Sequence, residues 1–220
     1  MSVLTVISIF ESIDGEVNGF HQGALTTFIR LSHCNLRCKW CDSTYSFEGG
    51  DVVSVENIVN IVKNLKPKKV TLTGGEPLLQ PEGVLELLTE LTKLGYSISV
   101  ETNGTLPVLL KSYNISWIYD YKLPSSGMES QMKFDNFATL ESTDWVKFVI
   151  ADDADFNRAI EIRKYLDGIG CLANYAYSPV PGFSTDTLVN RLLSKGKGDE
   201  IVSLQIHKIV WPNCGAIEEH

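Results

Sequence analysis

Short strand-like segments alternate with amphipathic helical segments along most of the 220 residues, and this alternation limits the fold more than any other feature. In the clearest unit, apolar residues recur at helical spacing from Val84 to Leu94, Gly95 follows as a C-cap, and residues 96–102 form the next strand. Strands that are separated by helices pair in parallel through right-handed crossovers. The sequence therefore predicts an α/β fold built on a parallel sheet.

The number of these units predicts the architecture. There are too few helices for a closed eight-fold barrel, so we expect a partial, open (β/α) barrel with about six parallel strands. The expected strands are residues 3–10, 25–32, 69–73, 96–102, 117–122, 145–150, 173–177 and 201–209, and the expected helices cover 55–65, 84–94, 153–166 and 185–194, the first with Ser54 as its N-cap. No linker, charge block or low-complexity stretch divides the chain, which predicts a single domain over residues 1–220.

Composition excludes several classes of partner. A net charge of −8 argues against binding to a nucleic-acid backbone, which requires a clustered basic surface. No apolar run reaches the roughly 18 residues that a membrane span needs, and the amino terminus lacks the charged region of a secretory signal. We therefore expect a cytoplasmic protein without nucleic-acid or membrane partners. The chain has five cysteines, and this odd number argues against a set of disulfides.

Three thiols lie close together in the sequence, at Cys34, Cys38 and Cys41. Soft sulfur ligands suit iron–sulfur clusters and zinc, and a structural zinc site takes four protein ligands. The other two cysteines stand far away, so a zinc site would need His33 or Asp42 as its fourth ligand. A 4Fe–4S cluster held by three cysteines would instead leave one iron free for an outside ligand, and we favour this interpretation.

The segment from Cys34 to Cys41 resembles the cluster signature of the radical S-adenosylmethionine (SAM) enzymes, and residues 73–77 (TGGEP) resemble their second motif. Further stretches resemble the 7-carboxy-7-deazaguanine synthase family, namely residues 28–30 (FIR), 41–43 (CDS) with Tyr45, 120–127 (DYKLPSSG) and 204–207 (LQIH). The resemblance implies a ring-contracting lyase of queuosine and 7-deazapurine biosynthesis. Such an enzyme converts 6-carboxy-5,6,7,8-tetrahydropterin into 7-carboxy-7-deazaguanine with loss of ammonia.

The resemblance also implies cofactors and a set of binding residues. Cys34, Cys38 and Cys41 would hold a 4Fe–4S cluster, and Ser43 would carry Mg²⁺ through its hydroxyl. The residues expected to bind SAM are Trp40, Gly75, Glu76, Glu101, Lys122, Ser125, Tyr177 and Ser178. Those expected to bind the substrate are Ile13, Asp14, Gly15, Glu16, Arg30, Thr73, Gln205 and His207, with the segment 201–220 closing the substrate side. No side chain is expected to act as an acid or base.

Individual residues support some of these roles on chemical grounds. Arg30 lies at the C-terminal end of its expected strand, where barrel enzymes place their active sites, and its planar guanidinium binds a carboxylate bidentately. Residues 11–23 form a long expected loop, which is typical of functional loops, and residues 14–17 (DGEV) depart from the family's usual Gln-Gly-Glu-Gly at the first and last positions. A lone histidine is more often structural than catalytic, so we expect His207 to bind and not to transfer protons.

Partners follow from the resemblance as well. It implies an electron donor such as flavodoxin or ferredoxin, and a homodimer. One alternative function is a radical SAM activating enzyme for a glycyl-radical partner protein, which would need an exposed groove; another is a non-enzymatic zinc-binding module. Pro212 matches the position where some relatives end their chain against the substrate, but this chain continues for eight more residues, so that contact is not transferred.

Overall fold

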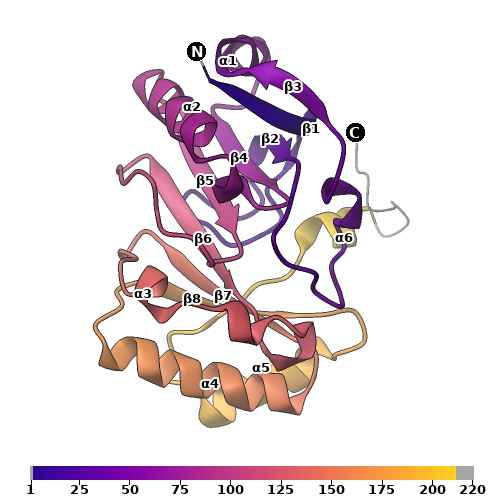
Figure 1. Ribbon diagram of the computed structural model, residues 1–220. Coiled ribbons are helices and arrows are strands. Elements are labelled where there is room, and N and C mark those ends of the chain that lie inside the picture. Colours follow the sequence, from indigo (N-terminus) through magenta and orange to yellow (C-terminus); the bar gives the residue numbers. More distant parts are fainter. Residues whose placement is uncertain (1, 212–220) are drawn as a thin grey trace.

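The computed structural model describes residues 2–211, whose strands form one nine-stranded sheet in the order β3-β1-β2-β4-β5-β6-β7-β8-β9 (Figure 1). The strands are β1 (Val3–Ile13), β2 (Leu25–Leu31), β3 (Asp51–Ser54), β4 (Lys69–Gly74), β5 (Ser97–Thr102), β6 (Ile115–Tyr121), β7 (Trp145–Ile150), β8 (Asn174–Pro179) and β9 (Ile201–Val202). The helices are α1 (Val55–Asn64), α2 (Pro81–Lys93), α3 (Phe134–Phe137), α4 (Asp153–Gly168), α5 (Thr185–Lys195) and α6 (Ile206–Val210), with 3-10 turns η1 (Thr44–Ser46), η2 (Pro77–Leu79), η3 (Pro124–Ser126) and η4 (Glu129–Gln131).

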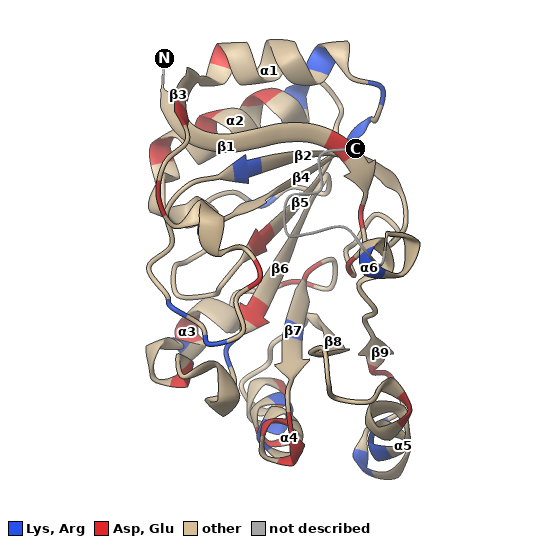
Figure 2. Cartoon of the chain, turned by 90° about the vertical axis from the view of Figure 1, so that its right-hand side faces the viewer, with Lys and Arg blue, Asp and Glu red and all other residues tan. Residues whose placement is uncertain are grey.

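The sheet is mostly parallel and open. From β2 to β9 each strand pairs in parallel with its neighbour, which confirms the α/β fold that the sequence predicts. Within the described residues, β3 and β9 lie at the two edges and do not pair with each other, so the barrel stays open. Helices α1, α2, α4 and α5 lie along the outside of the sheet (Figure 2). Among residues 2–211, no helix combines the length and the apolar character that a bilayer crossing demands.

The amino-terminal edge of the sheet differs from the prediction. β1 runs on to Ile13, through polar residues that we expected to begin a loop, because Glu11 and Ser12 pair with β2 in the antiparallel ladder. The short strand β3 adds a second antiparallel neighbour to β1, which the alternating pattern did not predict. Backbone pairing outweighs side-chain polarity here, and the connecting loop is confined to residues 14–24.

The expected strand at residues 201–209 is wrong. β9 covers only Ile201–Val202, and the chain then turns into the short helix α6. Ser203 still donates its backbone N–H to the carbonyl of Tyr177 at 2.9 Å, but Ile206 donates to the carbonyl of Gly15 at 3.2 Å. This contact with the loop 14–24 takes the chain away from the sheet edge. Pro212 and the remainder of the expected closing segment lie outside the described residues.

Helix boundaries follow local chemistry that the sequence shows. At the start of α1 the Ser54 hydroxyl accepts a hydrogen bond from the N–H of Asn57 at 3.3 Å. Beyond the end of α2, Gly95 has a φ of 77°, the left-handed conformation that favours glycine. The apolar stripes of both helices are buried in the main hydrophobic core.

Alternating side chains make the inner face of the sheet polar. In β4, Val70 and Leu72 belong to the apolar core that the helices cover. Lys69, Thr71 and Thr73 alternate with them and are buried on the opposite face. β5 repeats the pattern, so the interior of the partial barrel is lined by polar and charged groups, and each buried charge needs a partner.

Asp14 and Lys69 form one such partnership beneath the loop 14–24. The two side chains are 1% and 7% exposed and form an ion pair. Thr71 donates its hydroxyl to the same Asp14 carboxylate at 2.8 Å, and the backbone N–H of Asp14 bonds to the carbonyl of Ala24 at 2.8 Å. Asp14 therefore anchors both ends of the loop to the floor of the barrel.

Replacing Lys69 by methionine should lower the free energy of unfolding by about 3–5 kcal/mol, because it leaves the Asp14 charge buried without a partner. Urea unfolding at pH 7.5 measures this change. The matched control is the double variant Asp14→Asn/Lys69→Met, which removes both charges and should recover most of the loss. Equal stability of Lys69→Met and wild type would contradict the anchoring role.

Candidate active site

One cavity of about 510 Å³ brings together most of the residues that the sequence predicts for the site. It opens at the carboxyl ends of the parallel strands, where Thr73 and Glu101 are the next-to-last residues of β4 and β5. The expected residues that line it are Ile13, Asp14, Gly15, Glu16, Arg30, Cys34, Cys38, Trp40, Cys41, Ser43, Thr73, Gly75, Glu101, Lys122, Ser178, Gln205 and His207. Three expected residues are outside this lining: Glu76, Ser125 and Tyr177.

The cysteine loop is fixed to the end of β4 by close backbone contact. Gly75 donates its N–H to the carbonyl of Leu31 at 2.9 Å, and Glu76 donates to the carbonyl of His33 at 2.6 Å. A Cβ atom on Gly75 would lie 2.0 Å from the His33 oxygen, so no other residue fits. His33 itself has a φ of 73°, a conformation that turns the chain directly into Cys34. The two sequence motifs therefore form one structural unit.

The three thiols lie in the wall of one cavity, and soft sulfur ligands suit an iron–sulfur cluster. Among residues 2–211, no three His, Cys, Asp or Glu side chains are placed so that they could hold one metal ion. Zinc holds each sulfur ligand at about 2.3 Å and therefore requires the sulfurs to be nearly in contact. A cluster binds each thiolate through a different iron, and all three cysteines line the same cavity.

Burial disfavours free thiolates at two of the three cysteines. Burial raises the pKa of the Cys38 thiol to about 11 and also raises the pKa of Cys41. The Lys122 ammonium acts in the opposite direction at both thiols but does not offset the burial. A metal centre supplies the positive charge that thiolate ligands in such a site require.

The residues outside the cavity lining position their neighbours. Glu76 is fully buried, and its carboxylate accepts hydrogen bonds from the N–H groups of Asn103 at 2.7 Å and Leu78 at 2.9 Å and from the Thr102 hydroxyl at 2.8 Å. Burial raises the pKa of Glu76 in spite of these donors. This carboxylate therefore ties the turn after β4 to the end of β5, and Gly75, not Glu76, faces the cavity.

Ser125 and Tyr177 have comparable supporting contacts. The Ser125 hydroxyl donates to Asp155 and accepts a hydrogen bond from the indole N–H of Trp40 at 3.2 Å, which orients the tryptophan. The Tyr177 ring is fully buried, with its centroid 5.3 Å from that of Phe148. Both residues therefore contribute to the shape of the site from behind its walls.

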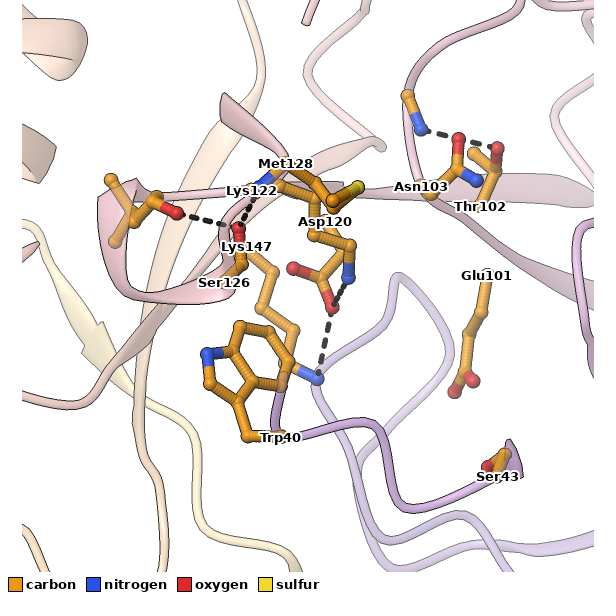
Figure 3. Close-up of polar contacts among 12 residues, drawn as sticks. Trp40, Ser43, Glu101, Thr102, Asn103, Asp120, Lys122, Ser126, Met128 and Lys147 are labelled. Carbon is orange, nitrogen blue, oxygen red and sulfur yellow. Dashed lines mark hydrogen bonds and ion pairs between the residues drawn. The ribbon is translucent and has the colours of Figure 1, made fainter. Parts of the chain in front are cut away.

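Opposite charges alternate along one wall of the cavity. Asp120 pairs with Lys122 at 3.0 Å and lies 4.0 Å from the ammonium of Lys147 (Figure 3). Lys147 in turn forms an ion pair with Glu16, whose other oxygen accepts a hydrogen bond from Gln205 at 3.0 Å. At the other end, the Lys122 ammonium lies 5.2 Å from the centre of the Trp40 ring. The row connects the cysteine loop with the loop 14–24.

Sequence reasoning missed roles for Asp120 and Lys147, both of which line the cavity, as does Asn103. Asp120 is the first residue of the segment 120–127, but the sequence pattern assigned it no function. A signal for Lys147 was available, because it is a single cation within the otherwise apolar strand β7. Asn103 follows Glu101 and Thr102 and donates a hydrogen bond to Asn35 of the cysteine loop at 2.8 Å.

Glu101 carries a carboxyl group in the cavity wall whose pKa is well above its ordinary value. Burial raises its pKa to about 7, and the nearby carboxylates of Glu16 and Asp14 act in the same direction. The Thr73 hydroxyl donates a hydrogen bond to it at 2.7 Å. Glu101 can therefore donate as well as accept hydrogen bonds near neutral pH, and its neighbours are residues expected to bind substrate.

Arg30 and the segment after the cysteines provide groups for an anion and a hard cation. Within the described residues Arg30 forms no ion pair, and its guanidinium lies 5.6 Å from the centre of the Tyr45 ring while facing the cavity. Ser43 donates its hydroxyl to Asp42 at 3.2 Å. Partial desolvation acts to raise the pKa of Asp42, but the Lys208 ammonium at 3.0 Å keeps it below its ordinary value, so Asp42 is ionised.

Comparison with known proteins agrees with this geometry. The family model described as the radical SAM superfamily matches residues 28–119. The 7-carboxy-7-deazaguanine synthase of Clostridium acetobutylicum is 38% identical over 217 residues, which cover 94% of this chain and 96% of the relative. This chain belongs to the 7-carboxy-7-deazaguanine synthase family. Another member, from Thermoplasma acidophilum, is 33% identical over 211 residues, which cover 94% of this chain and 97% of the relative.

A solved structure supports the fold of this family member. The crystal structure of QueE from Escherichia coli matches with a TM-score of 0.76 and 21% sequence identity, covering 92% of this chain and 94% of that one. The partial barrel is thus shared with a protein whose sequence has diverged widely. As a radical SAM enzyme, the chain uses a 4Fe–4S cluster and SAM. The cluster agrees with the prediction from the cysteine spacing, and SAM agrees with what the family resemblance implied.

Replacing Glu101 by glutamine should stabilise the protein increasingly as the pH rises. The wild-type folded state holds the Glu101 proton up to a pKa of about 7, whereas the unfolded chain loses it near 4.5, so wild type loses stability between these values. The variant should gain on the order of 1–3 kcal/mol over wild type at pH 8 and clearly less at pH 5. Urea unfolding at both pH values tests this.

The control for this experiment is Glu48→Gln, which changes an exposed carboxylate outside the cavity lining and should show no such trend. An equal gain for Glu101→Gln at pH 5 and pH 8 would show that Glu101 does not hold its proton in the folded state.

Proposed function

We propose that this chain is a radical SAM lyase that converts 6-carboxy-5,6,7,8-tetrahydropterin into 7-carboxy-7-deazaguanine and ammonia. One observation carries the proposal: a single cavity has the three thiols in its wall together with Arg30 and Glu16, which are suited to bind a carboxylate and a donor-rich ring edge. Near-full-length similarity to synthases of this name supports the same reaction.

Cys34, Cys38 and Cys41 would hold the cluster, and Trp40, Gly75, Lys122 and Ser178 would surround the SAM site. When bound, the cluster and SAM supply a carbon-centred radical that removes a hydrogen atom from the substrate. Around that chemistry, the protein orients the reactants and limits the access of water. The hydrogen bond from Trp40 to Ser125 fixes the indole plane, and the buried Glu76 fixes the turn that carries Gly75.

Arg30 would bind the substrate carboxylate, because its guanidinium faces the cavity and forms no ion pair within the described residues. The oxygens of Ser43 and Asp42 lie beside each other and suit Mg²⁺, which prefers oxygen ligands and would share the same carboxylate. Glu16 would accept hydrogen bonds from the N–H groups of the pyrimidine edge. Fixing both ends of the ring would hold C6 at the short distance that hydrogen transfer needs.

The segment after β9 supports a small-molecule substrate. Gln205, His207, Lys208 and Trp211 all line the cavity, and α6 crosses the loop 14–24. Gln22 reinforces this crossing by donating hydrogen bonds to the carbonyls of Leu204 at 2.8 Å and Gly15 at 3.0 Å. A pocket covered in this way suits a pterin better than a segment of a large partner protein. The proposal also includes dependence on Mg²⁺, a flavodoxin or ferredoxin as reductant, a homodimer and a cytoplasmic location.

Anaerobically reconstituted enzyme with SAM, Mg²⁺ and a reductant should form 7-carboxy-7-deazaguanine from the carboxytetrahydropterin, as measured by mass spectrometry of the product. The variant Cys38→Ala should lose iron and all product, while Cys171→Ala, which changes a cysteine outside the cavity, should retain both. Absence of the deazaguanine product from iron-loaded wild type at every magnesium concentration would refute the proposed function.

Replacing Arg30 by lysine should weaken binding of 6-carboxypterin about 10- to 100-fold, since lysine keeps the charge but loses the two parallel hydrogen bonds. Titration calorimetry without reductant measures the dissociation constant. The dissociation constant of pterin, which lacks the carboxylate, should change less than threefold in the same variant, because Arg30 has no carboxylate to bind. The control Arg37→Lys changes an exposed arginine of the cysteine loop that does not line the cavity. Equal weakening of both ligands would exclude Arg30 as the carboxylate site.

A further inference from the structure

Lys147 is a buried cation in the cavity wall whose function the proposed mechanism leaves open. It is the third residue of β7, which otherwise consists of apolar residues, and only 8% of its side chain is exposed. Burying an ammonium is costly unless it is paired, so its presence in an otherwise apolar strand calls for a specific interaction. Its pairing with Glu16 places it beside the group proposed to read the ring edge of the substrate.

The polar atoms around Lys147 are arranged in a defined order. One oxygen of Glu16 accepts a hydrogen bond from Gln205 at 3.0 Å, and the other pairs with the Lys147 ammonium. The Asp120 carboxylate lies 4.0 Å from the same ammonium (Figure 3). Gln205 thereby orients the carboxylate from the side opposite Lys147. Along this wall, the two acceptor oxygens of Glu16 are therefore followed by the donor ammonium of Lys147.

Lys147 keeps its charge in this position. Burial alone would lower its pKa, but the carboxylates of Glu16, Asp120 and Glu101 raise it above the ordinary value for lysine. An ammonium has three N–H donors, of which Glu16 and Asp120 engage at most two. At least one donor therefore remains for a ligand in the cavity that Lys147 lines.

A 2-amino-4-oxopyrimidine edge is the complement of this row. Its 2-amino group and N3–H are donors, and the oxygen at C4 is an acceptor. The two Glu16 oxygens match the donors, and the Lys147 ammonium matches the acceptor. A charge-assisted hydrogen bond to that oxygen in a buried site is strong enough to discriminate between ligands.

We propose that Lys147 is a specificity-determining residue that donates a hydrogen bond to the oxygen at C4 of the pterin ring, next to the two ring donors that Glu16 binds. This inference rests on the proposed function, since it concerns the same substrate. A purely structural role makes a different prediction. If Lys147 only oriented Glu16, its removal would weaken every ligand with the same 2-amino and N3–H groups by the same factor.

The test compares 6-carboxypterin with its 4-thioxo counterpart, which keeps both ring donors but offers sulfur, a weaker acceptor, at C4. Binding is measured by titration calorimetry on the reconstituted enzyme with SAM and without reductant, so that no turnover occurs. Wild type should bind the oxo ligand at least tenfold more tightly than the thioxo ligand. Lys147→Met should reduce this ratio to about twofold or less by removing the donor.

Glu16→Gln provides the matched control, because it should weaken both ligands while leaving the oxo-to-thioxo ratio close to that of wild type. If Lys147→Met fails to fold because Glu16 is left unpaired, the double variant Glu16→Gln/Lys147→Met replaces it. Its oxo-to-thioxo ratio should then be about twofold or less, whereas Glu16→Gln alone should keep a ratio close to that of wild type. The ratio isolates the contact at C4, since any change in the orientation of residue 16 affects both ligands equally.

An unchanged ratio in the Lys147→Met protein, or a wild type that binds both ligands equally well, overturns the assignment of Lys147 while the proposed function stands. Absence of binding of either ligand to iron-loaded wild type contradicts the pterin substrate, and the inference about Lys147 is then overturned with it.

Discussion

The contact between the end of β4 and the chain entering the cysteine loop is the constraint on which the rest of the site depends. The backbone of Gly75 lies so close to the carbonyl of His33 that a side chain cannot be accommodated, and hydrogen bonds close this contact on both sides. Backbone packed in this way cannot shift by a fraction of an ångström without losing those bonds. The thiols are consequently presented at the same edge of the sheet that displays Thr73 and Glu101.

Inside the barrel, stability and function use the same charged groups. Period-two alternation directs Lys69 and Lys147 inward, and each is buried beside a carboxylate from the loop 14–24. Such pairs add little net stability compared with apolar packing, but the loss of one partner is costly, so they specify one loop conformation. Asp14 holds the loop at its base, and Glu16 meets Lys147 within the cavity.

Local sequence patterns predicted elements whose causes are themselves local. The Ser54 cap, the Gly95 stop and the apolar stripes of α1 and α2 were correct because each depends on neighbouring residues. The edges of the sheet were less predictable. β1 extends through polar residues because β2 offers a pairing partner, and residues 206–210 form a helix after the chain turns to bond with Gly15. These outcomes depend on contacts between segments far apart in the sequence.

The sequence by itself determined the class of chemistry and the open α/β fold, since thiol spacing limits the possible metal centres and alternating strands and helices limit the topology. Only the tertiary structure decided which motif residues face the cavity. It placed Glu76 outside the cavity lining, where its carboxylate binds the backbone of Asn103, and it brought Lys147 and Asp120 into the site. The physical reason is that pairing of buried charges depends on distances across the barrel, which no local pattern in the chain encodes.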